Sequence, residues 1–241
     1  MRALQKIVNG RKTLCFLDLE GTQFSHEMIA IGALKVDLKK DGSVKKIAKP
    51  FYSLVIPKNK VGKIVVDLTG LTDEKIKKEG KKLREVMQGL KKYLGKSFTS
   101  TLFITYGNHD ARILAQSQAY NLDAPTEDIK IMIKHNFDLA EFMYQYIKDE
   151  HGNSYSLSNA LNEFHVDFKG TKHNALADTY NLVYLYEALI EHPEIVAVHY
   201  KDTIAKSKQY PECVHKLINK LVNNESVTPE EFEKLILEEI I

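Results

Sequence analysis

The chain has 241 residues, of which 44% are hydrophobic and 27% charged, and a net charge of +2, a balance typical of a soluble globular protein with a substantial core. No apolar run reaches the roughly 18 residues of a membrane span, and the first residues lack the apolar segment of a secretory signal. We therefore expect a cytoplasmic protein, with no membrane association, whose two cysteines, Cys15 and Cys213, are free thiols.

Strand patterns come first along the chain. Residues 13–19 are apolar on both alternating faces, which predicts a strand buried on both sides near the centre of a sheet. Two more strands are expected over residues 28–37 and 47–56, with Asp41 and Gly42 supplying the turn between them. Together the three strands predict an antiparallel meander.

Strand and helix patterns then alternate. Apolar residues at helical spacing predict a helix from Thr72, its N-cap, to about Gly95. A buried strand over 101–107 leads into a helix over 110–120. The remaining expected elements are a short strand or entry segment from about residue 131, and helices within 138–150, from Ser156, over Lys172–Glu191, over 211–223 and over 229–241.

The order of these elements predicts the domain organisation. Strands followed by alternating strands and helices favour an α/β layered domain with a mixed sheet, which we place at residues 1–192. No strand pattern occurs beyond Pro193, so residues 193–241 are expected to form a helical C-terminal extension. This extension could pack on the domain, form a dimer contact or bind a partner protein.

The charge is unevenly distributed. Residues 1–100 contain 22 Lys and Arg against 10 Asp and Glu, whereas residues 101–241 contain 12 against 22. Lysines and arginines that neutralise phosphates release counterions, so the excess in the first part is consistent with a surface that binds a polyanion. A lysine-rich face that is merely solvated remains the alternative.

Two acids lie at the end of the first strand. Asp18 and Glu20 are two residues apart, so on a strand both carboxylates point to the same face. Burying two acids together is costly unless a cation neutralises them, and hard oxygen ligands suit Mg²⁺ or Mn²⁺. An Asp-x-Glu pair by itself is also common among surface acids.

Two further blocks contain candidate ligands. Asp110 follows the strand over 101–107 at a strand-to-helix turn, where its alternative role is a helix cap. His173 and Asp178 lie at the start and in the second turn of the Lys172–Glu191 helix, and Asp178 interrupts an apolar stretch. Taken alone, each of the two could be an ordinary core or surface residue.

The three blocks together resemble a known family. FLDLEGT (16–22), YGNHD (106–110) and HNALAD (173–178) are similar in order and residue type to the three motifs of the DEDDh (DnaQ-like) 3′-5′ exonucleases. The resemblance spans roughly residues 12–192 and implies a ribonuclease-H-like fold with a mixed five-stranded sheet flanked by helices. The second motif is most similar to the branch of histone-mRNA 3′-end exonucleases and KapD-like proteins, which favours RNA. Ala30 stands where the family often has an acid.

The resemblance also implies a mechanism. Two ions of Mg²⁺ or Mn²⁺ would be held by the four acids: Asp18 would bridge them, Glu20 and Asp178 would complete the first site, and Asp110 would hold the second. His173 would act as the general base that takes the proton from the attacking water. Hydrolysis from the 3′ end of single-stranded RNA or DNA would release nucleoside 5′-monophosphates.

Substrate contacts are expected from residues beside these acids. Gly21 and Thr22 follow the first pair, where the family's backbone meets the terminal sugar. Leu71 lies in a loop whose apolar side chain could pack on the last base, and Asn108 and His109 are in the second motif, with His109 a candidate for base stacking. Each could equally be an ordinary turn or packing residue.

Two alternative functions remain open from the sequence. One is a DNA 3′-5′ exonuclease that acts in repair or proofreading. The other is a module that binds nucleic-acid ends or a partner protein without cutting, against which the complete set of four acids and one histidine argues.

Overall fold

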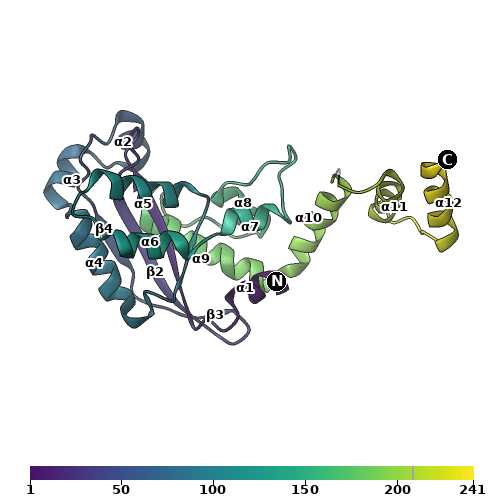
Figure 1. The fold of residues 1–241 in the computed structure, drawn as a ribbon, viewed down its shortest axis with the longest axis horizontal. Coiled ribbons are helices and arrows are strands. Elements are labelled where there is room, and N and C mark those ends of the chain that lie inside the picture. Colours follow the sequence, from purple (N-terminus) through teal and green to yellow (C-terminus); the bar gives the residue numbers. More distant parts are fainter. Residues whose placement is uncertain (208) are drawn as a thin grey trace.

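A computed structural model describes residues 1–207 and 209–241 (Figure 1). Its centre is a mixed sheet in which β3, β2, β1, β5 and β6 follow one another and β4 also pairs with β2. β1 is antiparallel to β2 and parallel to β5, and β5 is parallel to β6. The strands are β1 (Thr13–Gly21), β2 (Met28–Leu38), β3 (Val44–Ile47), β4 (Phe51–Leu54), β5 (Leu102–Thr105) and β6 (Asn136–Asp138).

The sheet therefore has the expected mixed topology but six strands instead of five. The strand predicted over residues 47–56 corresponds to β4, whereas β3 overlaps it only at Ile47 and pairs with the other end of β2. Pro50 lies between them, and a proline has no N–H to donate to the ladder. The sheet remains five strands wide, with a divided edge strand.

Helices cover both faces of the sheet. The helices α1, α7, α8 and α9 pack on one face, and α4, α5 and α6 on the other. In the described residues the helices are α1 (Arg2–Val8), α2 (Lys63–Thr69), α3 (Asp73–Glu79), α4 (Leu83–Leu94), α5 (His109–Tyr120), α6 (Thr126–Lys134), α7 (Leu139–Tyr144), α8 (Leu157–Glu163), α9 (Ala175–Glu191), α10 (Pro193–Ala205), α11 (Glu212–Val222) and α12 (Pro229–Ile240). A short 3₁₀ turn follows α4 at Gly95–Ser97.

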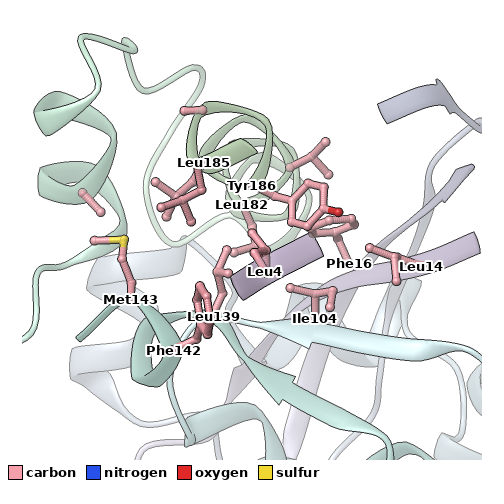
Figure 2. Packing of buried hydrophobic residues seen from close by; sticks show 14 of the residues in the cluster. Leu4, Leu14, Phe16, Ile104, Leu139, Phe142, Met143, Leu182, Leu185 and Tyr186 are labelled. Carbon is pink, nitrogen blue, oxygen red and sulfur yellow. The ribbon is translucent and has the colours of Figure 1, made fainter. Parts of the chain in front are cut away.

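The core on the α9 face fixes this helix along β1. Phe16 of β1 and Tyr186 of α9 meet edge to face with ring centroids 5.3 Å apart, and both are fully buried (Figure 2). The Tyr186 hydroxyl donates a 2.7 Å hydrogen bond to the carbonyl of Gly42 in the turn after β2. These contacts fix the position of α9 along β1, whose C-terminal end contains Asp18 and Glu20.

Several helices differ from the sequence predictions. The helix expected from Thr72 to Gly95 is two helices, interrupted where Gly80 leaves the helical conformation and Lys81 forms a bridge with Val55. The last helix of the domain starts at Ala175 instead of Lys172. The sequence patterns predicted none of α1, α2, α6 and α10, although Thr72 caps its helix as expected and the helix expected from Ser156 is capped by that serine.

The C-terminal helices extend away from the sheet (Figure 1). α10 is attached to the domain, where Tyr200 packs against Tyr146 and the Thr203 hydroxyl donates to the carbonyl of Tyr146. Further along, Lys220 of α11 forms an ion pair with Glu231 of α12. Among residues 1–207 and 209–241, no helix is long and apolar enough to cross a bilayer.

Candidate active site

The end of β1 places two acids on the α9 face of the sheet. Asp18 and Glu20 continue the alternation of Leu14 and Phe16, which are buried in the core beneath α9. The strand register pairs Asp18 with Gly32 of β2. Both carboxylates thus lie where the apolar part of that face ends.

A glycine lets α9 approach these acids. A Cβ built on Gly32 would lie 2.3 Å from the carbonyl oxygen of Ala175, the first residue of α9. Any side chain at position 32 would therefore displace the start of the helix. Asp178, in the first turn, follows Ala175 by three residues and so projects from the same helix face.

The three acids form one cluster. Carboxylate oxygens of Asp18, Glu20 and Asp178 all lie within 4.8 Å of one another. All three side chains are partly buried, so little water screens their mutual repulsion. Three acidic oxygens at this spacing match the hard ligands that a divalent cation such as Mg²⁺ or Mn²⁺ prefers.

Asp110 is beside the cluster and is almost fully buried, with 4% of its surface exposed. Its carboxylate accepts a 2.8 Å hydrogen bond from the backbone N–H of Leu19, between the two acids of β1. The alternative role as a cap of α5 is not observed, because no side chain caps that helix. Asp138, at the end of β6, holds the turn between β5 and α5 by accepting a 2.8 Å hydrogen bond from the N–H of Gly107.

Burial raises the pKa of every acid in this group, and repulsion from neighbouring acids adds to the effect for Asp18, Glu20 and Asp110. Burial raises the pKa of Asp18 well above its ordinary value, and the other three acids add to the effect. Burial also raises the pKa of Glu20 to about 8 and that of Asp110 to about 7. For Asp178 burial raises the pKa to about 6, against the opposing effect of His173. A positive charge among these carboxylates would favour their ionised forms and lower their pKa values.

His173 lies at the edge of the cluster. It is exposed and precedes α9 in a left-handed backbone conformation, with φ of 61°. The structure thus places it before the helix, and not at its start as the sequence pattern predicted. It is close enough to Asp178 to lower the pKa of that acid.

The five expected substrate residues have different surroundings. Gly21 ends β1, and a Cβ there would lie 2.9 Å from Ile113 of α5. Thr22 is buried, and its hydroxyl accepts from the N–H of Glu27. Leu71 is also buried, in a cluster beside α9. Only Asn108 and His109 expose their side chains.

The loop between β1 and β2 contains residues that the motifs did not single out. Phe24 has 82% of its surface exposed, although large apolar side chains are usually covered. His26, two residues further, meets His109 edge to face with ring centroids 5.4 Å apart. Buried Glu27 fixes the loop by accepting from the backbone N–H groups of Lys58 and Asn59. The sequence contained one signal for this loop, the aromatic residue Phe24 two positions after the FLDLEGT motif.

The fold and the acid cluster are those of a ribonuclease-H-like nuclease. The sequence profile of the RNase_T family, described as an exonuclease family, matches residues 15–186. The chain belongs to this exonuclease family, and its three motifs are those of the DEDDh group within it. No curated protein matches the chain by sequence.

Solved structures of exonucleases share the fold. A 3′-exonuclease described as recognising the histone mRNA stem-loop superposes with a TM-score of 0.62 at 17% identity, covering 76% of this chain and 65% of that one. The nuclease domain of 3′hExo, a DEDDh family member bound to rAMP, gives 0.58 at 16% identity, covering 77% and 94%. E. coli Exonuclease I with a dA16 oligonucleotide gives 0.58 at 16% identity, covering 86% and 45%. This chain thus spans slightly less than two thirds of the first.

Proposed function

We propose that this protein is a metal-dependent 3′-5′ exonuclease that acts on single-stranded nucleic acid, preferentially RNA, and releases nucleoside 5′-monophosphates. The observation that carries the proposal is the cluster of Asp18, Glu20 and Asp178, with Asp110 bonded to the strand between the first two. An apolar core has no use for four acids with raised pKa values at one strand end, whereas a phosphodiesterase needs such a site.

The residues present fit a pair of divalent cations. Asp18 is central, because all three other acids raise its pKa, and we assign it to both cations. Glu20 and Asp178 would complete one position and Asp110 the other. When bound, two such ions lower the pKa of a water molecule and stabilise charge on the entering and leaving oxygens.

His173 is assigned the proton transfer. Its exposed imidazole lies near Asp178 at the edge of the cluster. A neutral imidazole accepts a proton near neutral pH, so the side chain can take the proton from the attacking water. Asp178 then stabilises the resulting imidazolium.

The 3′ end is assigned to the loops around the acids. Phe24 and His109 expose aromatic surface on which bases can stack. Because the side chain of Thr22 is buried, we assign contacts with the terminal sugar to the backbone of Gly21 and Thr22. The side chain of Leu71 is buried as well. Leu71 would reach the last base only through the part of its surface that remains exposed.

A direct comparison of substrates tests the function. Single-stranded RNA and DNA of one sequence are incubated separately with Mg²⁺ and Mn²⁺, and the released mononucleotide is measured. We expect stepwise shortening from the 3′ end, faster on RNA, and no release by Asp178→Asn. Equal release by that variant would contradict the assignment of the acids.

RNA is favoured over DNA by the second motif and by the fold shared with an exonuclease described as recognising a histone mRNA stem-loop. The similarity to Exonuclease I in complex with an oligodeoxynucleotide supports the alternative, a DNA 3′-5′ exonuclease. Faster release from the DNA strand would favour that alternative. Binding without any release would indicate a non-catalytic module.

A further inference from the structure

A hollow at the opposite end of β1 from the acids is rich in basic residues. It has a volume of about 730 Å³ and lies between α1, the segment before β1 and the turn after β2. Figure 1 shows α1 and β3 at the end of the sheet away from α2 and α3. Six cationic side chains and one carboxylate line it: Arg2, Lys6, Arg11, Lys12, Lys39, Lys40 and Asp41.

Of these cations, only Lys39 lies near enough to carboxylates, those of Asp41 and Glu187, to lower their pKa values within the described residues. In the described part of the chain, none of the six forms a salt bridge. Asp41 accepts hydrogen bonds from both the N–H and the hydroxyl of Ser43 within its own turn. Arg2 and Lys6 are four residues apart on one helix, an arrangement in which like charges destabilise the helix. A bound polyanion would relieve this repulsion.

The hollow is held in a fixed shape. Gln5 of α1 donates a 3.0 Å hydrogen bond to the carbonyl of Asp41 and so joins the two basic segments. Arg11 donates to the carbonyl of Ser100 at 2.9 Å. Buried Val8 and Leu38 form the apolar floor. A preformed basic site loses less entropy on binding than mobile lysines would.

The divided edge strand connects this hollow to the acids. β3 pairs with β2 near the hollow, whereas β4 pairs with the part of β2 that lies beside Asp18. Three exposed lysines lie along this edge at Lys45, Lys46 and Lys49. Lys12 precedes Asp18 by six residues, which corresponds to about 20 Å along an extended strand.

We propose that the basic hollow binds backbone phosphates of the substrate strand several nucleotides upstream of its 3′ end. The choice of ligand rests on the proposed nuclease function, whereas the basic site itself does not. Phosphate contacts position a strand without reading its sequence, so the hollow would increase affinity for long strands of any sequence. Strands too short to reach the hollow would bind with the same affinity whether or not its basic residues are present.

Charge reversal tests this proposal. Binding of a twenty-nucleotide strand and of a trinucleotide is measured in an Asp18→Asn background, in which cleavage is blocked. The test variant is Lys6→Glu, Lys12→Glu and Lys40→Glu; Lys39 is left unchanged because it also lies near Glu187. The matched control reverses three exposed lysines on the other face of the sheet, Lys92, Lys96 and Lys134, which form no salt bridge within the described residues.

We expect the test variant to bind the long strand at least tenfold more weakly and the trinucleotide unchanged. The slope of log affinity against log salt should decrease by roughly two, at about 0.7 per lost phosphate contact. Equal losses in test and control variants, or none in the test variant, would overturn the proposal. Should the charge-reversed variant fail to fold, the Lys→Gln version replaces it, with an expected loss of at least threefold.

The same strands separate this proposal from the function on which it rests. If the wild-type protein releases mononucleotide from the trinucleotide while the test variant binds the long strand normally, the hollow is not a binding site and the nuclease stands. If the wild type releases nothing from either strand, the nuclease fails. In that case a selective loss of long-strand affinity in the test variant still supports a site for nucleic-acid phosphates.

Discussion

Replacing Asp110 with asparagine should stabilise the metal-free protein at alkaline pH. The carboxyl has a pKa of about 7 against an ordinary value of 3.8, and its side chain is only 4% exposed. One unit of pKa corresponds to about 1.36 kcal/mol, so ionising this group costs the fold up to about 4 kcal/mol. The amide oxygen of asparagine can still accept the hydrogen bond from Leu19.

The pH dependence follows from the direction of the shift. The pKa of Asp110 is higher in the folded than in the unfolded protein. The wild type therefore has its full stability below about pH 4, where Asp110 is protonated in both states, and loses this contribution as pH rises through about 7. Asp110→Asn removes this loss. The variant should therefore match the wild type near pH 4 and be more stable by a few kcal/mol near pH 8.

Urea unfolding with a chelator, at both pH values, measures the effect. Saturating Mn²⁺ should reverse the order at pH 8, since a cation that binds only the folded state stabilises the wild type more than a variant that lacks one ligand. If the free energy of unfolding fell equally with pH in both proteins, Asp110 would not be a strained, buried acid.

Three other substitutions give separate predictions. His173→Ala should lower turnover at least about 100-fold, the usual contribution of a general base, while calorimetry shows unchanged Mn²⁺ binding; an unaltered rate over pH 6–9 would exclude the base role. Gly32→Ala should lower the free energy of unfolding by about 1–3 kcal/mol in urea, since its Cβ meets α9, and wild-type stability would show that the helix can shift freely. Phe24→Ala should weaken binding of single-stranded oligonucleotides about fivefold or more, from roughly 1 kcal/mol of lost stacking, with unchanged melting temperature; equal affinity would remove Phe24 from the substrate surface.

The proximity of the acids, which the structure shows, depends on local order that is visible in the sequence. Asp18 and Glu20 share a strand face because side chains alternate, so their spacing alone brings them together. Asp178 joins them in the structure as the motif order implied. The importance of Gly32 was not predictable, because it depends on which helix crosses β2 at that residue.

The errors in the predicted fold also have non-local causes. The helix expected to continue through Gly80 ends there because Lys81 pairs with Val55, far away in the sequence. The burial of Leu71 depends on packing against residues of β2 and α9. Likewise, the excess of lysine in the first 100 residues was visible in the sequence. Its concentration around one hollow required the contact between α1 and the turn at Asp41.

The most direct test of the central assignment is mononucleotide release from a 5′-labelled RNA strand with Mg²⁺ or Mn²⁺, by the wild type and by Asp18→Asn. The account predicts a ladder that shortens one nucleotide at a time from the 3′ end, nucleoside 5′-monophosphate as the product, and no shortening by the folded variant. Shortening by Asp18→Asn at the wild-type rate, or an intact strand with the wild type, would contradict it.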